Sequence, residues 1–371
     1  MKKRNTSQQS PKRTPKGPAR RSLTIGMDLG DKSSRWCLLD EEGAVVDEGS
    51  VATTKKAMLQ TFSSRPRCRI AMEVGTHSPW ISRLLSRLGY EVIVANARRV
   101  QLISKSSSKD DRIDARTLAR LARVDPQLLR PIRHRSEEAQ QDLMVIRVRA
   151  ALVDARTSLV NAARGLAKSV GERLPTCDAD ALVPAKLAGL PKSLQQTLRP
   201  LLEEVEGMTA RIKASDQHVE QIARTKYPET ELLRQVSGVG PLIALTYVLT
   251  VDDPHRFAQS RDMGCYVGLR PKRGDSGERQ PQLRITKEGD IYLRKLLVQG
   301  AQHILHRGPD TDVKRWGRKL AERGGKNAKK RALVAVARKL AILLHCLWVT
   351  GEVYEPLRNS QAQPRGKQAA A

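Results

Sequence analysis

The chain has few aromatic residues and few cysteines. Only 3% of its 371 residues are Phe, Trp or Tyr, which disfavours a protein that stacks many unpaired bases on aromatic side chains. The five cysteines are far apart and form no CxxC pair or Cys/His cluster with zinc spacing. We interpret them as reduced thiols of a cytosolic protein. No apolar run reaches about 18 residues, so the sequence predicts no membrane span.

The charge is strongly one-sided. Lys and Arg number 67 against 39 Asp and Glu, a formal net charge of +28. Such an excess favours a polyanionic partner, nucleic acid first and an anionic membrane surface second. Recognition of a duplex through its backbone and shape agrees with the scarcity of aromatic residues. Residues 1–21 are basic and lack the apolar region of a secretory signal, so we predict a disordered arm there and a disordered tail at 356–371.

Residues 22–130 carry the pattern of an α/β domain. Short β-rich runs bounded by turns occur at 23–28, 35–40, 44–53, 68–73 and 90–97. Amphipathic stretches at 78–89 and 110–124 predict helices. Three strands joined by short turns, followed by strands separated by helices, indicate a mixed α/β plan.

The rest of the chain is predicted to be mainly helical. Residues 131–230 show apolar residues at three- and four-residue steps over 137–171 and 198–227, with a proline-containing connector at 174–191. This predicts an antiparallel coiled-coil hairpin whose exposed seam could serve dimerisation. Residues 231–355 form a further compact region, which ends in a basic to apolar helix at 326–351 that we expect to pack on it.

Four carboxylates stand at positions that suit a metal site. Asp28 ends the first apolar run and Glu73 ends the fourth. If these strands are neighbours, both carboxylates emerge side by side, which is costly without a counter-ion. Asp111 and Asp114 are three residues apart on a helix and share one face. Four carboxylates without His or Cys suit Mg²⁺, and two such ions support phosphoryl transfer.

A structural role for these acids is the alternative. Asp28 would then start a turn and Glu73 would be an ordinary strand end. Asp110, Asp111 and Asp114 would cap their helix and interact with its N-terminal dipole.

Ser276 stands in a glycine-bounded loop at 268–289 that is rich in Arg and Lys. A hydroxyl among such cations can attack a phosphate whose charge they neutralise. Taken alone the loop is weak evidence, because Ser-Gly is common turn chemistry. Gly238, Gly240 and Pro241 in "VSGVGP" suit a turn before a helix whose N-terminal amides approach a phosphate, or a plain connection between two core helices.

The chain resembles the DEDD transposases of the insertion-sequence 110 family. The resemblance is carried by "IGMDLGDKSS", "IAMEVGTHSPW", "SKDDRIDARTLA" and the block at 236–301, and it extends over roughly residues 22–350. It implies an RNase H-like (RuvC-like) domain, a coiled-coil middle and a mainly helical C-terminal transposase domain. It also implies a cytoplasmic protein that acts at the nucleoid of a bacterium or archaeon.

The resemblance assigns site residues. Asp28, Glu73, Asp111 and Asp114 correspond to the family's Mg²⁺-binding acids, with Mn²⁺ as a possible substitute, and Asp110 stays unassigned. Ser276 corresponds to a serine that links covalently to DNA, with the acids of one subunit and the serine of another making one site. The implied partners are donor and target double-stranded DNA, an element-encoded bridge RNA and further copies of the chain in a dimer or tetramer.

One position departs from the family, and several basic residues complete the predicted site. His77 stands where many relatives have a Thr-Gly-Thr-Tyr type of run, which leaves a DNA contact or a packing role open. Besides Gly238 and Gly240, the predicted nucleic-acid contacts are Arg270, Lys272, Arg273, Arg279, Arg284, Lys287 and Arg294. A solvated basic face is the alternative for any one of them.

The sequence therefore predicts an Mg²⁺-dependent transposase that cleaves DNA and exchanges strands through Ser276. Two rivals remain. One is a RuvC-like, structure-selective nuclease in which water replaces the serine. The other is a non-catalytic nucleic-acid-binding protein with a degenerate RNase H fold.

Overall fold

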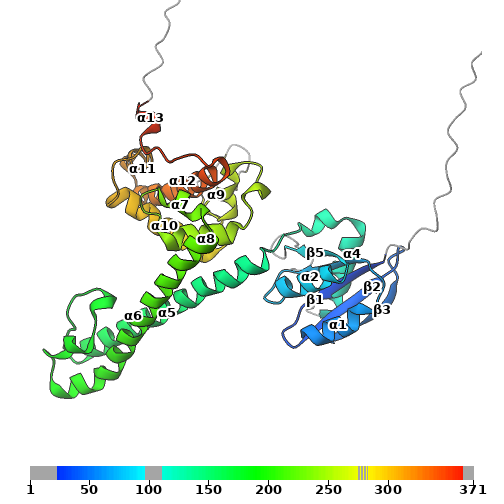
Figure 1. The fold of residues 1–371 in the computed structure, drawn as a ribbon, viewed down its shortest axis with the longest axis horizontal. Helices are drawn as coiled ribbons and strands as arrows, with labels where there is room; N and C mark the ends of the chain where they lie inside the picture. Colours follow the sequence, from blue (N-terminus) through cyan, green and yellow to red (C-terminus); the bar gives the residue numbers. More distant parts are fainter. Residues whose placement is uncertain are drawn as a thin grey trace, which may run out of the picture. The chain divides into compact units, whose positions relative to one another are not determined.

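The computed structural model describes residues 23–96, 111–274, 276, 279, 281 and 283–361. The predicted basic arm, Asp110 and most of the predicted tail lie outside these residues. The chain divides into two compact units, Met1–His134 and Arg135–Ala371 (Figure 1). The first boundary falls close to the predicted one at 130, while the helices predicted at 131–230 share one unit with the C-terminal helices.

The first unit is built on a mixed sheet, as predicted. Its strands are β1 (Thr24–Asp28), β2 (Ser33–Leu39), β3 (Val45–Ala52), β4 (Arg69–Glu73) and β5 (Glu91–Ala95). The strand order is β3-β2-β1-β4-β5. β2 is antiparallel to β1 and β3, whereas β4 is parallel to β1 and β5. Four of the five described strands lie within runs predicted from the sequence, and β2 begins at Ser33, before the predicted run at 35–40.

Helices α1 (Lys55–Ser63) and α2 (Ser78–Arg87) cover one face of this sheet. Met58 and Phe62 of α1 and Ile81 of α2 are fully buried against it. The sequence analysis did not identify α1, which is short and begins after the capping hydroxyl of Thr54. The first unit is therefore a layered α/β structure, with α1 and α2 on one face of the sheet and a further helix on the opposite face.

That second face is covered by α4 (Asp111–Val124), which packs very closely on the sheet. A Cβ placed on Gly26 of β1 would lie 2.0 Å from the Ala115 carbonyl oxygen and 2.4 Å from the Ala119 nitrogen. Only the α-hydrogen of a glycine fits between β1 and α4 at this position. Five alanines also lie in this seam, namely Ala71 and Ala95 on the strands and Ala115, Ala119 and Ala122 on the helix, together with larger apolar residues such as Leu39 and Leu118.

Two arginines fix the direction of α4 across the sheet. Arg69, at the start of β4, donates from Nη1 to the Ala122 carbonyl at 3.0 Å. Arg123 donates from Nη1 to the Glu41 carbonyl at 2.9 Å, beyond the end of β2. The C-terminus of α4 therefore lies at the start of β1 and β4. Its N-terminus lies at the opposite end, where Asp28 and Glu73 stand.

The second unit begins with a long antiparallel hairpin of α5 (Glu137–Ser169) and α6 (Lys192–Lys226). Short 3-10 turns, η2 (Ala179–Ala181) and η3 (Pro184–Leu187), lie in the connector. The predicted start of the second helix at 198 was wrong, because α6 begins at Lys192. Leu198 and Leu202 are fully buried against α5, and this packing holds the first turns of α6 helical.

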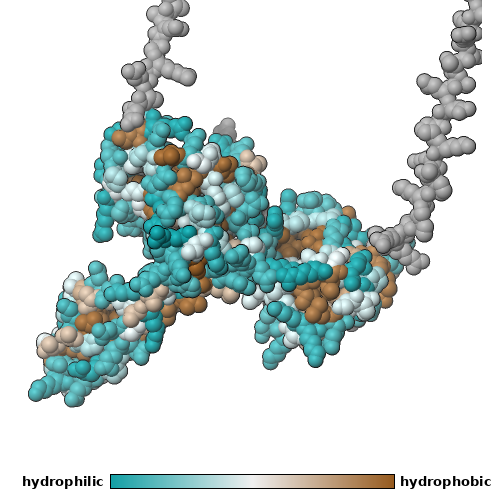
Figure 2. Space-filling view, viewed as in Figure 1, coloured by the Kyte–Doolittle hydropathy of each residue, from teal (hydrophilic) through white to brown (hydrophobic). Residues whose placement is uncertain are grey.

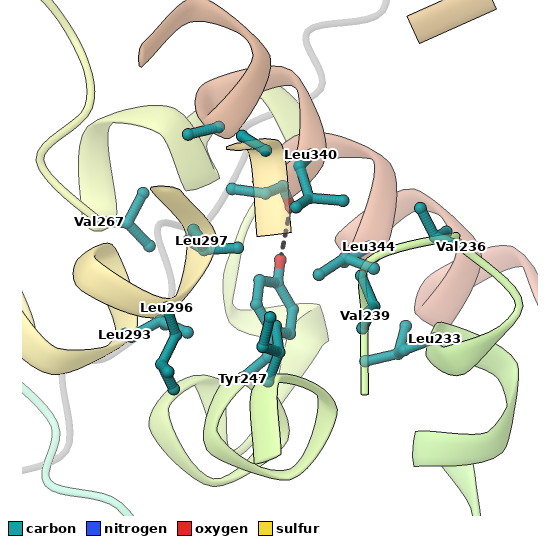
Figure 3. Packing of buried hydrophobic residues seen from close by; sticks show 14 of the residues in the cluster. Leu233, Val236, Val239, Tyr247, Val267, Leu293, Leu296, Leu297, Leu340 and Leu344 are labelled. Atoms are coloured by element: carbon teal, nitrogen blue, oxygen red, sulfur yellow. Dashed lines mark hydrogen bonds between the residues drawn. The ribbon is translucent and has the colours of Figure 1, made fainter. Parts of the chain in front are cut away.

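The remaining helices follow the hairpin along the chain, and all but the last share one core. They are α7 (Glu229–Arg234), α8 (Pro241–Val251), α9 (Met263–Tyr266), α10 (Ile291–His306), α11 (Asp312–Glu322), α12 (Ala328–Thr350) and α13 (Arg358–Gln361). Tyr247 of α8 is fully buried at its centre and donates its hydroxyl to the Ala341 carbonyl of α12 at 2.7 Å (Figure 3). The last helix, α13, lies within the stretch predicted as a disordered tail.

One described helix differs from the expectation about membranes. By length and composition α12 is long and apolar enough to cross one. Its apolar side chains Val336, Leu340 and Leu344 are however fully buried in the core of the second unit. The visible surface around this core is mostly hydrophilic, with scattered apolar residues (Figure 2). The packing accounts for the apolar composition of α12.

The Gly26 seam generates a prediction about stability. Replacing Gly26 by Ala should destabilise the first unit by about 2 kcal/mol or more, since the new methyl group overlaps backbone atoms of α4. Hydrogen exchange of full-length protein should show faster exchange in β1 and α4. Gly75→Ala is the matched control, because no atom lies within 4 Å of its Cβ position. Equal protection in both variants would contradict the close packing.

Candidate functional site

Two carboxylates end neighbouring strands of the sheet in the first unit, and a third stands in the first turn of α4; we call Asp28, Glu73 and Asp114 the acidic edge. Met27 of β1 pairs with Met72 of β4, so Asp28 and Glu73 follow side by side on neighbouring strands. Gly26 and Ala71 face α4, and strand residues two positions apart share a face. Asp28 and Glu73 therefore also point to the α4 side.

Asp114 approaches from the first turns of α4. Burial raises the pKa of the Glu73 carboxyl, and repulsion by the Asp114 carboxylate raises it further. Glu73 and Asp114 are both half-buried. Bringing two carboxylates together in a partly desolvated place is unfavourable without a cation.

The acidic edge has the donor chemistry of a hard divalent cation but is not a complete cluster. Among the described side chains, no group of three or more His, Cys, Asp or Glu has the spacing of a metal site. Asp111 is the first residue of α4, and its side chain lies outside the described part of the chain. A bound metal, and Mg²⁺ as its identity, stay predictions.

His77 is used within the first unit. It stands just before α2, where Nδ1 accepts a hydrogen bond from the Trp80 indole at 3.1 Å. Its Nε2 lies 3.3 Å from Oδ1 of Asp31. Of the two roles left open by the sequence, these contacts favour packing.

Ser276 lies in the second unit, at the tip of a hairpin-like loop; we call residues 268–287 the serine arm. Pro271 pairs with Ile285 in an antiparallel bridge, and Ser276 pairs with Arg279 through two backbone hydrogen bonds of 3.2 and 3.1 Å. Asp275, Gly277, Glu278, Gln280 and Gln282 lie outside the described residues. The Ser276 residue is exposed, so its hydroxyl is accessible to a large substrate.

The predicted cations of the serine arm fall into two groups. Five are exposed, namely Lys272, Arg273, Arg279, Arg284 and Lys287. Arg270 is half-buried, and its Nη1 lies 3.7 Å from Sγ of Cys265. The exposed group supplies positive charge on the same arm as Ser276.

Arg294 does not belong to this exposed group. It is only 9% exposed, and its Nη1 donates to the Val267 carbonyl at 2.9 Å and to the Glu288 carbonyl at 2.5 Å. These carbonyls flank the two ends of the serine arm. Arg294 therefore does not belong to the predicted phosphate-facing stripe, because its guanidinium bonds the base of the serine arm to α10. Helical spacing gave no indication of which face of α10 is buried.

The glycine turn before α8 has the predicted geometry. Gly238 has a φ of 87°, and Gly240 precedes Pro241 at the start of α8. A Cβ on Gly238 would lie 2.9 Å from the Gly300 carbonyl, so close packing on α10 requires this glycine. Gly240 is exposed and its Cβ position is open. A phosphate contact of Gly240 stays a prediction.

The second unit has a groove that was not predicted from the sequence. It has a volume of about 1000 Å³ and is lined by the serine arm, α11 and α12. Its basic residues include Lys330 and Arg331, in a stretch that we interpreted only as the start of a packing helix. The run "KNAKKR" was the available signal.

Comparison with known proteins identifies similar chains. Residues 25–171 match a family model for transposases of the DEDD, IS110 type, and residues 230–316 match one described as transposase IS116/IS110/IS902 family. The transposase for insertion sequence element IS1111A of Coxiella burnetii is 29% identical over 345 residues, 89% of this chain and 90% of that protein. A probable family 20 transposase of Pseudomonas aeruginosa is 29% identical over 342 residues, 90% of this chain and 98% of its own length.

The acidic edge generates a prediction about pH. Because the folded-state pKa of Glu73 lies above its ordinary value, its favourable contribution is complete at low pH and is lost as pH rises through the raised pKa. Glu73→Gln should therefore gain thermal stability over the wild type as pH rises from about 4 to about 7. Mg²⁺ should stabilise the wild type more than the variant. Glu42→Gln, in an exposed turn, is the control and should follow the wild type. A variant less stable than the wild type at neutral pH would contradict the repulsion.

Arg294 generates a second prediction. Arg294→Gln should cost about 1–3 kcal/mol of stability, because two partly buried carbonyls lose a charged donor. The salt dependence of nucleic-acid binding should stay unchanged. Lys295→Gln, at the exposed neighbouring position, should change stability by no more than about 0.5 kcal/mol. A salt slope reduced by about one in Arg294→Gln, with unchanged stability, would instead indicate a phosphate contact.

Proposed function

The chain belongs to the insertion-sequence 110 family of transposases, and from this premise we propose that it recombines DNA by metal-dependent cleavage and serine-linked strand exchange. Two matching family models and relatives aligned along most of the chain support its assignment as a DNA-processing enzyme. The observation that carries the finer proposal is the acidic edge, where the N-terminus of α4 brings Asp114 to Glu73.

The first unit is proposed to be an RNase H-like catalytic domain. Support comes from its mixed sheet, in which three strands paired antiparallel are followed along the chain by two strands that pair in parallel, in the order β3-β2-β1-β4-β5. Support also comes from the acids at the ends of β1 and β4, beside α4. Asp28, Glu73, Asp111 and Asp114 would hold Mg²⁺, or Mn²⁺ in its place. A divalent ion bound there would neutralise charge on a phosphate and lower the pKa of a bound hydroxyl.

Ser276 is proposed to be the nucleophile. Its Oγ would form a bond to phosphorus while the bond from phosphorus to the DNA 3′ oxygen breaks. The serine loses its proton to solvent or a neighbouring base, and the departing 3′ oxygen takes one up. Exposed cations such as Arg279 on the same arm would balance the charge of the phosphate.

The rest of the second unit is proposed to hold the DNA backbone and to assemble copies of the chain. Gly240, at the exposed start of α8, would offer backbone amides to a phosphate. A net charge of +28 supports a large polyanionic assembly that includes donor DNA, target DNA and a bridge RNA. Dimers or tetramers follow from the need to exchange two duplexes.

A structure-selective nuclease is the second candidate. It is favoured by the distribution of the residues, because the acidic edge belongs to the first unit and Ser276 to the second. A water nucleophile would need the acids alone. The two functions differ in whether a covalent protein–DNA bond forms.

The test is a denaturing-gel assay with purified protein, Mg²⁺, the RNA flanking the element and labelled end DNA. A protein–DNA band that resists denaturation should form with the wild type. Ser276→Ala and Asp28→Asn should each reduce it by at least about 10³-fold, since one removes the nucleophile and the other a carboxylate of the metal site.

Matched controls keep this test specific. Ser169→Ala removes a hydroxyl at the end of α5, and Asp31→Asn neutralises a carboxylate whose side chain is 92% exposed. Both should retain the band. Cleavage that needs Asp28 but survives loss of Ser276, without any such band, would reject the serine mechanism and leave the nuclease.

A further inference from the structure

The groove between the serine arm, α11 and α12 is lined by Lys and Arg and by apolar side chains; we call it the basic groove, and we call its apolar lining residues the apolar floor. Eight of its lining residues are Lys or Arg, and none of the lining residues in the described chain is Asp or Glu. Arg284 and Lys287 come from the serine arm, while Lys326, Lys330 and Arg331 come from the start of α12. Its volume of about 1000 Å³ is enough for a ligand of several rings.

The charges at the start of α12 are unfavourable for the helix itself. The first turn of a helix favours acidic residues, because the amide dipoles place partial positive charge there. The first turn of α12 contains no acidic residue and instead carries Lys329, Lys330 and Arg331. The side chain of Asn327, which precedes the helix, makes no capping hydrogen bond. Amides and cations thus converge at one place, which an anion would stabilise.

The turn before α12 adds to this arrangement. Gly324 and Gly325 have φ values of 75° and 90°, conformations that other residues rarely adopt. Nothing lies within 4 Å of the Cβ position of Gly324. Two glycines followed by Lys326 and a helix N-terminus let backbone approach a phosphate closely.

The floor of the groove is suited to a flat apolar group. Leu283 and Ile285 of the serine arm, with Leu320 and Ile342 of α11 and α12, lie along it. Trp316 also lines the groove, with the Lys339 ammonium 4.6 Å from the centre of its ring. A ligand with phosphates and flat bases matches both the positive charge and the apolar residues of this lining.

We propose that the basic groove binds a segment of unpaired DNA strand, with phosphates at the start of α12 and bases over the apolar floor. This rests on the proposed function, because DNA is the nucleic acid on which a transposase acts. A base reaches such a floor only when it has no partner strand. The groove shares Arg284 and Lys287 with the serine arm, so the bound segment would lie beside a strand cut at Ser276.

The test measures binding of the full-length protein to a labelled single-stranded DNA oligonucleotide by fluorescence anisotropy in EDTA. A variant with Lys326→Gln, Lys330→Gln and Arg331→Gln should bind at least about tenfold more weakly, with a salt slope lower by about 2. A variant with Lys168→Gln, Arg173→Gln and Lys192→Gln removes the same charge from exposed positions around the hairpin. Equal losses of affinity in the two variants would overturn the groove as the binding site.

Folding and ligand chemistry are separated by further measurements. The groove variant should melt at the wild-type temperature or above it, because it removes cations from a helix N-terminus, and a lower melting temperature would overturn that part of the reasoning. The wild type should bind an abasic oligonucleotide at least about threefold more weakly than one with bases. Equal binding would show that no base uses the floor.

The same measurement with other nucleic acids completes the test. The groove variant should lose less affinity for a blunt duplex than for the single strand. An equal loss for both would overturn the assignment of an unpaired strand to the groove. A loss confined to RNA of the same sequence would overturn DNA as the occupant. Since EDTA removes catalysis, wild-type binding by the groove variant would reject the groove while leaving serine-linked cleavage intact. Weakened binding in a chain that forms no serine-linked band would reject only the cleavage mechanism.

Discussion

The close approach of α4 to β1 is the constraint on which the acidic edge depends. At Gly26 the helix backbone comes so near that a methyl group would lie 2.0 Å from a carbonyl oxygen. Arg69 and Arg123 fix the far end of α4 to the starts of the strands and to the turn beyond β2. Because its C-terminal end is fixed and its middle packs on β1, the first turns of α4 lie beside Asp28 and Glu73. The position of Asp114 thus depends on the packing of glycine and alanine residues and on two arginines, none of which has a proposed catalytic role.

Much of the acidic edge could be predicted from the sequence, because strand ends and helix faces are local properties. Asp28 and Glu73 end apolar runs, and Asp111 and Asp114 are three residues apart. The direction of α4 across the sheet could not be predicted, since it depends on contacts of Arg69 and Arg123 with distant backbone. For the same reason the start of α6 was predicted too late: the helix begins at Lys192, and its first turns are held by tertiary packing such as the burial of Leu198.

The basic residues show why net charge alone does not define a binding surface. Arg116 holds Glu48 of β3 through two hydrogen bonds of 3.0 and 2.8 Å, and Arg294 holds two carbonyls at the base of the serine arm. These guanidinium groups support the fold. Arg279 and Lys287 have the same charge but are exposed. Spacing along the sequence does not separate the two kinds, because burial depends on which helix face meets the core.

Two places in the described part of the chain gather charge of one sign, and the two signs are opposite. In the first unit, Asp114 adds negative charge beside the partly buried Glu73. In the second unit, Lys330 and Arg331 stand at the positive end of the α12 dipole. Under the proposed function, a divalent cation would offset the first charge and a phosphate the second. Phosphoryl transfer on DNA would use both ligands, so one reaction would account for both sites.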